Sequence, residues 1–236
     1  MYFIGCSGWF YWHWRDKFYP PDLKQSEWFK YYTKYFSTVE LNSSFYHWPK
    51  LSRVRSWYKA APEGFVYTLK VNNIITHIKR FNETNELIKE FYKLGDELKD
   101  KLGCFLFQLP PSLKFSMDKL KVILEQLDYE KKNVIEFRHI SWFNEDVYNE
   151  FKKNEVIFCI ISYPKLPEDF IKTSDDIYIR FHGKKARYAS NYTNEELEVW
   201  AKRIKEVNAK NVWAYFNNDF NAYAITNSLY LKKLLS

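Results

Sequence analysis

Short runs of Val, Ile, Leu, Phe and Tyr recur along the whole chain and alternate with segments of mixed polarity. Most runs contain almost no polar position, which is typical of strands covered on both faces of a sheet. The segments between them have helical patterns of apolar and polar residues. The predicted strands are residues 2–7, 38–42, 65–72, 104–109, 134–138, 156–162, 177–182 and 212–217, and the predicted helices are residues 26–36, 52–61, 83–102, 118–127, 145–153, 194–207 and 227–234.

Three of the predicted helices have recognisable start signals. Thr193 is followed three residues later by Glu196, which is the spacing of a capping box. Ser116 and Asn144 stand directly before two other helical patterns and are residue types that cap helix N-termini.

Eight strands alternating with helices predict a single (β/α)8 TIM-barrel-like domain over residues 1–236, with about 30 residues in each strand–helix unit. No Gly/Ser-rich linker or charge block divides the chain. One unit is irregular, because residues 163–176 contain Pro164 and Pro167 and no clear helix between strands six and seven. A doubly wound open sheet is the main alternative, which the lack of a glycine fingerprint weakens.

Composition narrows the function classes. One fifth of the residues are aromatic, which excludes a disordered chain. None of the six glycines belongs to a GxGxxG or GxxxxGK[ST] motif, so a Rossmann fingerprint and a P-loop are absent and the cofactor stays open. The net charge of +7 is compatible with nucleic acid or with a small anionic substrate, and demonstrates neither.

The positions of the cysteines and the hydropathy of the chain indicate a cellular compartment. Cys6, Cys104 and Cys159 lie singly inside apolar runs, which predicts buried free thiols in a reducing cytosol. No signal peptide precedes the first strand, and the longest uncharged apolar stretch, residues 156–163, is too short to span a bilayer. The sequence therefore predicts a soluble cytoplasmic protein with no membrane partner.

Polar residues interrupt the apolar pattern near the carboxyl end of six predicted strands. Barrels and open α/β sheets both place their sites at these ends. Each residue also has a structural interpretation, because pairs such as Glu136–Arg138 or Glu40–Arg180 can close the barrel as ion pairs. Across six strands we favour function. The residues are Glu40, Asn42, Lys70, Asn72, Gln108, Glu136, Arg138, His139, Arg180, His182, Asn217, Asn218 and Asp219.

Two loops add to this set. Trp9 begins an aromatic loop that runs to Trp14 and Arg15, whose flat rings can stack on a base or a sugar. We expect most of these rings to form a lid on the barrel and one or two to face a ligand. After strand seven, residues 182–187 include three cations, which suits a phosphate or carboxylate, although a solvated basic loop is equally compatible.

Metal and nucleophile sites have weaker support. A metal site can be drawn from His77, His139, His182, Glu136 and Asp219, but no established ligand spacing is present, so we predict no metal. Residues 6–7 end strand one without a Gly-x-Ser-x-Gly elbow, and the thiol there is expected in the core.

Several motifs together resemble one family. They include residues 5–9, 18–20 and 39–46, then Lys70, 76–77, 108–111, 136–139 and 141–142, and finally 180–183 and 216–219. In this order they resemble the domain of unknown function 72 family, also called YecE-like, over essentially the whole chain. The resemblance implies a TIM-barrel-like fold and no reaction.

The chain departs from that family pattern in two places. Residues 161–164 read Ile-Ser-Tyr-Pro where an acidic residue is expected after strand six, and no glycine follows Asp219. A mechanism that needs a carboxylate from strand six is therefore not expected here.

The leading hypothesis is an enzyme, hydrolase-like, that performs acid/base chemistry on an anionic, phosphorylated or sugar-like substrate. Glu136 would act as general base or acid, with His182 or His139 as its proton-transfer partner. Lys70 would hold or polarise the anion. The other expected substrate-binding residues are Trp9, Glu40, Asn42, His77, Gln108, Arg138, Arg180, Asn217, Asn218 and Asp219.

The alternative is a barrel that binds or processes nucleic acid. Its support is the net charge, the aromatic loop and the basic loop. A purely structural protein ranks last, because it does not account for polar residues at six strand ends.

Overall fold

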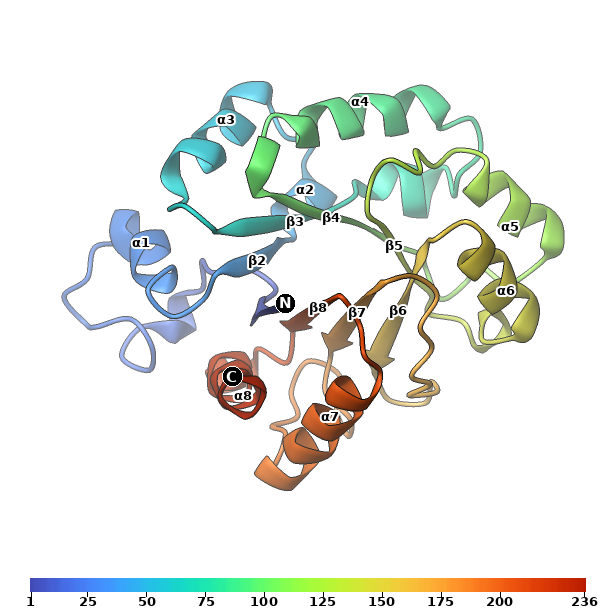
Figure 1. Ribbon diagram of the computed structural model, residues 1–236. Helices are drawn as coiled ribbons and strands as arrows, with labels where there is room; N and C mark the ends of the chain where they lie inside the picture. The colour runs from blue at the N-terminus through green and yellow to red at the C-terminus, as the bar shows by residue number, and fades with distance from the viewer.

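Eight parallel strands form one sheet that curls into a barrel in the computed structural model, which describes all 236 residues (Figure 1). The predicted TIM-barrel-like class is confirmed, and the doubly wound alternative is wrong, because the first strand pairs with the last. The strand order is β1-β8-β7-β6-β5-β4-β3-β2. The bounds are β1 Tyr2–Cys6, β2 Thr38–Leu41, β3 Val66–Lys70, β4 Leu102–Gln108, β5 Asn133–Glu136, β6 Ile157–Ser162, β7 Asp176–Phe181 and β8 Asn211–Phe216.

Helices surround the sheet, as expected when each strand is covered on its outer face. No helix lies between β6 and β7, which agrees with the irregular unit predicted there. The α-helices are α1 Trp28–Tyr32, α2 Ser43–Tyr46, α3 Leu51–Ala60, α4 Asn85–Asp96, α5 Met117–Leu124, α6 Glu145–Lys153, α7 Asn194–Glu206 and α8 Tyr223–Leu235. Short helical turns are η1 Trp12–Trp14, η2 Gln25–Glu27, η3 Ile74–Ile78, η4 Lys99–Lys101, η5 Ile140–Trp142 and η6 Phe220–Ala222, of which η3 is a π-helix.

Three predicted helix boundaries differ from the structure by four or more residues. The helix predicted over 26–36 ends at Tyr32. The helix predicted over 83–102 ends at Asp96, and the left-handed backbone of Lys99 (φ 48°) redirects the chain into β4. The last helix begins at Tyr223 and not at Asn227, whose buried side chain bonds to the backbone of Tyr192 instead of capping.

The predicted N-caps are confirmed. The Ser116 hydroxyl accepts a hydrogen bond from the Lys119 N–H, and the Asn144 side chain accepts one from the Val147 N–H. Thr193 forms the full capping box with Glu196, as the spacing predicts.

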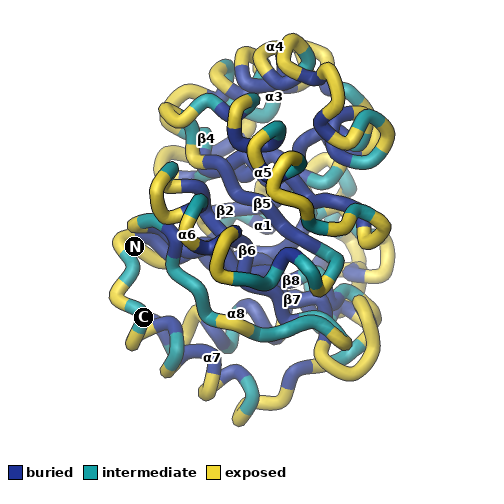
Figure 2. The backbone as a smooth tube through the Cα atoms, turned by 90° about the vertical axis from the view of Figure 1, so that its right-hand side faces the viewer, coloured by how far each residue is buried: buried dark blue, intermediate teal, exposed yellow.

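The barrel interior is filled below its carboxyl end, so it is a packed core and not a pore. Phe3 stacks on Trp213 near the amino ends of the strands, with ring centroids 4.1 Å apart. Above them the Tyr215 hydroxyl bonds to Thr38 and Thr68 at 2.6 and 3.0 Å. Dark-blue buried segments follow the strands in Figure 2. Cys6, Cys104 and Cys159 are free and buried, as predicted.

The seam between β1 and β2 differs from the other strand boundaries. These strands approach closely without forming a ladder, and a Cβ on Gly5 would lie 2.5 Å from the Thr38 carbonyl oxygen. The Tyr32 hydroxyl bridges them instead: it accepts from the Cys6 N–H and donates to the Thr38 carbonyl, each at 3.0 Å. One buried side chain thus satisfies backbone groups that a ladder would otherwise pair.

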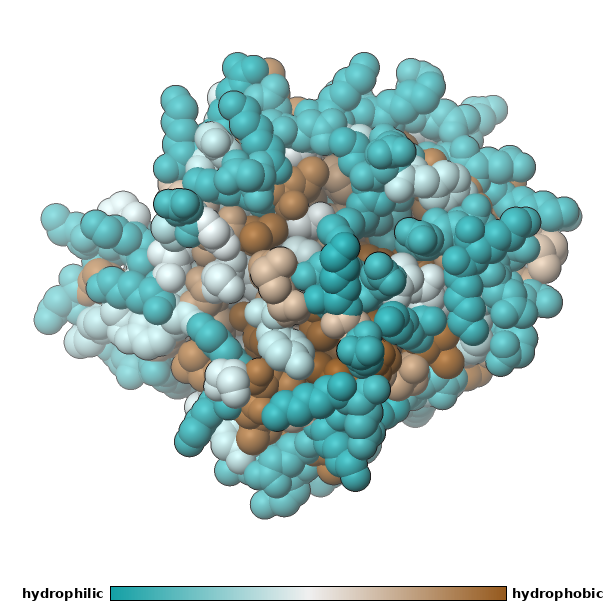
Figure 3. Space-filling view, viewed as in Figure 1, coloured by the Kyte–Doolittle hydropathy of each residue, from teal (hydrophilic) through white to brown (hydrophobic).

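The two chain ends lie on one side of the molecule, opposite the loops that follow the strands (Figure 2). Figure 3 shows the side of the chain ends, with hydrophilic residues around the periphery and hydrophobic ones gathered toward the middle. None of the helices has the length and apolar character that crossing a bilayer requires.

Candidate functional site

Five side chains at the carboxyl ends of the strands form a buried cluster, which we call the ionic cluster: Glu40, Glu136, Arg138, Arg180 and His182. Arg180 lies at its centre and has no exposed surface. Its Nη1 donates to Glu136 Oε2 and its Nη2 donates to Glu40 Oε1, both at 2.5 Å. The predicted pairs Glu136–Arg138 and Glu40–Arg180 are therefore ion pairs in the structure.

Every carboxylate oxygen of the cluster has a partner. Glu40 also accepts from the Ser7 hydroxyl at 2.7 Å and from the Tyr178 hydroxyl at 2.6 Å. Glu136 accepts from Arg138 on the oxygen that Arg180 leaves free. Buried charges are tolerated only when they are paired and hydrogen-bonded in this way.

These contacts fix the protonation of the cluster. Burial works to raise the pKa of Glu136, but Arg138 and Arg180 hold it well below its usual range. Burial and then Arg138 lower the pKa of His182, so its imidazole is neutral. Its Nε2 accepts from Arg138 Nη2 at 2.9 Å, and its Nδ1 lies 3.3 Å from the Asn217 amide nitrogen.

Above the cluster, the loops that follow the strands enclose a cavity of about 900 Å³, which we call the mouth cavity. Eight of its thirteen lining residues are polar, and they include three cationic side chains, one histidine and a single carboxylate. The lining residues are Tyr11, His13, Lys17, Asn42, Tyr46, Lys70, Arg187, Tyr188, Ala189, Asn217, Asp219, Phe220 and Asn221.

Lys70 faces the mouth cavity from the end of β3 and is 8% exposed. It takes no part in the ion pairs of the ionic cluster, and its Nζ lies 4.0 Å from the centroid of the Phe45 ring. Burial and the nearby charge of Arg180 lower the pKa of Lys70 to about 7. The amine therefore exchanges its proton near neutral pH.

Asp219 faces the same cavity from the loop after β8. Burial raises the pKa of this carboxyl group to about 6, although hydrogen bonding from Trp14 and the proximity of His13 oppose the shift. Trp14 Nε1 donates to Asp219 Oδ1 at 2.6 Å, and His13 Nε2 lies 2.8 Å from Oδ2. Asp219 thus also titrates close to neutrality.

Two predicted site residues lie beside Lys70. The His77 ring packs edge-on against Phe45, with centroids 5.0 Å apart, and its Nε2 lies 3.5 Å from the Gln108 amide nitrogen. Burial and then Lys70 lower the pKa of His77 to about 4, so this imidazole is neutral. The π-helix η3 carries His77 into this position.

Three other predicted residues point elsewhere. The His139 Nδ1 accepts from the Ser141 N–H and caps η5. The Asn218 side chain is buried and donates to Ser190 and Asn227, which ties β8 to α8. Trp9 packs on Phe29, with ring centroids 4.8 Å apart, and lines a second, neighbouring cavity instead of the mouth cavity.

The sequence did not single out several residues of the mouth cavity. Tyr46 and Lys17 line it, as does His13, which lies within the aromatic loop after β1. Tyr46 closes the short helix α2 immediately after β2, so proximity to a strand end was an available signal. The position of Lys17 follows from the fold of the first loop, which no strand pattern specifies.

The histidines and carboxylates from which a metal site can be drawn do not converge. His182 and Glu136 lie in the ionic cluster, whereas His139 caps a turn and Asp219 faces the mouth cavity. No group of three or more metal-ligating side chains comes together in the molecule.

A parallel eight-stranded barrel with charged residues at the carboxyl ends of its strands defines a TIM-barrel-like protein. The chain belongs to the DUF72 family, described as "Protein of unknown function DUF72", which matches residues 3–236. The resemblance drawn from the sequence motifs is thereby confirmed.

Relatives and solved structures agree with this assignment. The UPF0759 protein YunF of Bacillus subtilis is 27% identical, with 100% of this chain and 95% of YunF aligned. The UPF0759 protein YecE of Escherichia coli K12 is 26% identical over 48% of this chain and 42% of YecE. A DUF72 family protein from Thermotoga maritima superposes with a TM-score of 0.91 at 30% identity, covering 100% of this chain and 99% of that one.

A DUF72 family protein from Enterococcus faecalis superposes with a TM-score of 0.86 and covers 100% of this chain and 95% of its own. At 22% identity that likeness concerns the fold alone.

Proposed function

We propose that this protein is an enzyme that transfers protons on a small anionic substrate bound in the mouth cavity. Asp219 accepts a proton and Lys70 donates one. The observation that carries the proposal is that these two groups, with pKa values moved to about 6 and about 7, line one cavity at the carboxyl end of the barrel. Acids and bases transfer protons best when their pKa values lie near the working pH.

The charge around the cavity supports an anionic substrate. Lys17, Lys70 and Arg187 line it against the single carboxylate of Asp219. A bound anion would raise the pKa of Lys70 again and keep the amine protonated, ready to donate. The amides of Asn42 and Asn217 supply hydrogen bonds for orientation.

The ionic cluster has a positioning role in this proposal. Glu136 and His182 have no exposed surface, and both Glu136 oxygens already accept from arginines. Their expected part in proton transfer stays a prediction, and the accessible groups of the mouth cavity are better placed to touch a substrate. Glu136 would act through Arg138 and Arg180, whose charges shape the field at Lys70.

Chemical labelling tests the two properties required of Lys70. At pH 7, trinitrobenzenesulfonate should modify Lys70 ahead of surface lysines, because about half of the Lys70 amine is in the reactive, unprotonated form at this pH. Inorganic phosphate should slow this reaction and leave the modification of Lys153, an exposed lysine on α6, unchanged. Peptide mapping by mass spectrometry measures both rates. Equal, phosphate-insensitive rates at the two lysines would exclude an anion-binding Lys70.

Turnover tests the reaction itself. Phosphorylated sugars are incubated with the protein in D2O, and NMR follows product formation and deuterium uptake. A converted substrate should give a bell-shaped pH profile of kcat/KM with limbs at about 6 and 7. Asp219→Asn should lower the rate about 100-fold or more, whereas Asp118→Asn, on exposed α5, should not. Full activity of Asp219→Asn would refute the assignment.

A second candidate, nucleic-acid binding, has its own observation. Large aromatic side chains are exposed on four of the loops that follow the strands, and a basic loop after β7 carries Lys184, Lys185 and Arg187. Exposed rings with nearby cations suit single-stranded nucleic acid. The aromatic residues are Phe10, Trp12, Tyr46, Tyr188 and Phe220.

Fluorescence anisotropy with labelled single-stranded, duplex and abasic DNA and with RNA, at two salt concentrations, tests this candidate. Phosphate contacts predict affinity that falls steeply with salt. The variant for the test is Lys184→Ala/Lys185→Ala/Arg187→Ala and not Arg180→Ala, because Arg180 is fully buried. Lys152→Ala/Lys153→Ala on α6 is the charge control. Absence of binding at low salt would eliminate this candidate.

A further inference from the structure

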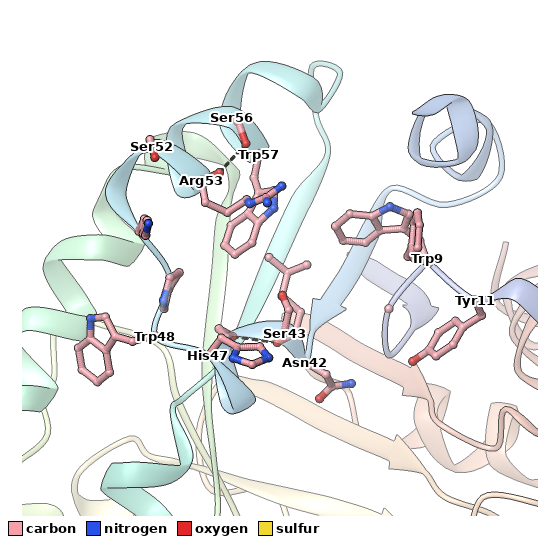
Figure 4. Close-up of a pocket in the computed structure, with 16 residues that line it drawn as sticks. Trp9, Tyr11, Asn42, Ser43, His47, Trp48, Ser52, Arg53, Ser56 and Trp57 are labelled. Carbon is pink, nitrogen blue, oxygen red and sulfur yellow. Dashed lines mark hydrogen bonds between the residues drawn. The ribbon is translucent and has the colours of Figure 1, made fainter. Parts of the chain in front are cut away.

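A second cavity of about 870 Å³, which we call the side groove, lies between the loop after β1 and the α2–α3 segment. Figure 4 shows its lining residues, among them Trp9 on one side and Trp57 of α3 on the other. No Asp or Glu is part of this lining. The reaction proposed above makes no use of the groove.

The side groove adjoins the mouth cavity, because Tyr11 and Asn42 line both. The Tyr11 hydroxyl is held by the Ser7 carbonyl at 2.5 Å. Asn42 is less well satisfied: its amide nitrogen reaches the same carbonyl only at 3.4 Å, and its buried Oδ1 has no hydrogen-bond partner. The amide of Asn42 is thus weakly held at the junction, and it can turn toward a ligand that extends through both cavities.

Flat rings form the walls of the groove. Trp9 and Trp57 lie on opposite sides of the open space in Figure 4, and both are partly buried. Phe29 supports the Trp9 ring from behind, with centroids 4.8 Å apart. Two indole rings across a gap, one of them backed by Phe29, suit the stacking of a planar ring, a mode of binding that tolerates any base.

Cations lie at the rim of the groove. Lys50 and Arg53 are exposed there, and neither belongs to an ion pair. Together with Lys70 and Arg187 in the mouth cavity, they make both cavities electropositive. A ligand that fits the pair of cavities therefore combines a planar ring with an anionic group.

We propose that the side groove is the nucleobase subsite of the active site, and that the substrate is a nucleoside phosphate. The base stacks between Trp9 and Trp57, Asn42 bonds to the sugar or the base edge, and the phosphate enters the mouth cavity toward Lys70. This inference rests on the proposed function for the phosphate end only, because the stacking site is formed by different residues.

Isothermal titration with AMP, adenosine and ribose 5-phosphate at constant ionic strength tests the proposal. AMP should bind at least 10-fold more tightly than either fragment, since it fills both cavities. Trp57→Ala should weaken the binding of AMP about 10-fold or more and leave the binding of ribose 5-phosphate unchanged. Trp57→Phe should restore most of the affinity for AMP. Tyr129→Ala is the control, because this exposed aromatic residue lines neither cavity.

The outcomes separate the two proposals. If ribose 5-phosphate binds as tightly as AMP and Trp57→Ala has no effect, the base subsite is refuted while the anion site stands. If adenosine binds as tightly as AMP and Lys70→Met does not matter, the stacking site stands and the anion site fails. Absence of binding by all three compounds would overturn the inference, as would equal losses from Tyr129→Ala and Trp57→Ala.

Discussion

The ionic cluster and the mouth cavity both contain charged side chains at the carboxyl end of the same barrel, but these charges are paired in the cluster and not in the same way in the cavity. In the cluster, the guanidinium groups of Arg138 and Arg180 face the carboxylates of Glu40 and Glu136, so the charges cancel. In the mouth cavity, Lys70 has no carboxylate partner and instead lies over the Phe45 ring. The cluster is closed to solvent, whereas Lys70 faces open space.

This difference shows that burial of a charged group does not by itself identify a reactive residue. Complete pairing drives Glu136 and Arg180 toward permanently charged states, which makes them rigid anchors. Neither Lys70 nor Asp219 has a buried, permanently charged partner of the kind that Glu136 has in Arg180, and burial shifts the pKa values of both groups toward neutrality. These two groups are therefore the ones poised for proton transfer.

The largest effect is expected from breaking the cluster. Arg180→Met removes the shared partner of two buried carboxylates and should lower the free energy of unfolding by about 3–5 kcal/mol. Urea unfolding measures this loss. The triple variant Glu40→Gln/Glu136→Gln/Arg180→Met also removes the two carboxylates that would be left without a partner, and it should recover part of the lost stability. A cost of less than about 1 kcal/mol for Arg180→Met would show that the cluster is not a stabilised unit.

Substitution of Lys70 is expected to change the free energy of unfolding in the opposite direction, toward greater stability. The native state lowers the pKa of this amine from 10.5 to about 7, so the unfolded chain binds more protons between these pH values. Wild-type stability should therefore rise with pH across this window, and below it the burial of Lys70 is unfavourable. Lys70→Met should raise the free energy of unfolding at pH 7 by about 2 kcal/mol, after allowing for the lost contact with Phe45.

Urea unfolding of both proteins at pH 7 and pH 10 checks this expectation, with Lys153→Met as the control for removing a lysine. The advantage of Lys70→Met should shrink at the higher pH. A destabilised Lys70→Met variant at pH 7 would mean that Lys70 has a partner and belongs with the cluster.

A smaller effect is expected at Asp219. The native state raises the pKa of this carboxyl from 3.8 to about 6, so the native state binds more protons in that window and loses stability as the pH rises through it. The stability of wild type relative to Asp219→Asn should fall by about 1–2 kcal/mol between pH 4 and pH 7. Melting temperatures at the two pH values measure this, with Asp118→Asn as control. A constant difference would indicate an ordinary surface carboxylate.

Much of the fold was predictable because the strands are continuous apolar runs in a barrel covered on both faces. All eight strands lie within two residues of their predicted bounds. Errors arose where tertiary contacts override local pattern, as at Asn227, which resembles a helix start but serves as a buried link to Tyr192 and Asn218. The helix α2 and the π-helix η3 were missed because they are too short to show a period.

The sequence predicted the location of the site, at the carboxyl ends of the strands, better than it predicted the roles of the individual residues. Alternation along a strand correctly places Glu136 and Arg138 together, and the same rule separates Asn218 from its neighbours Asn217 and Asp219. Sequence spacing carries no information on depth below the surface or on the number of charged partners. Burial depth and the number of charged partners distinguish Lys70 from Arg180, and both are set by tertiary contacts between strands that are distant in the sequence.

The bridging hydroxyl of Tyr32 has a dynamic consequence. Because β1 and β2 share no ladder, the seam has fewer backbone hydrogen bonds to break than any neighbouring boundary, and local opening of a protein begins at such places. Amide hydrogen exchange of Cys6 is therefore expected to be fast for a buried strand, and faster in Tyr32→Phe. Tyr11 and Asn42, which follow β1 and β2, lie on the two sides of this seam and line both cavities. A ligand that contacts both residues would stabilise the barrel at the boundary with the fewest backbone hydrogen bonds. Slower amide hydrogen exchange at the seam would then report that the ligand is bound.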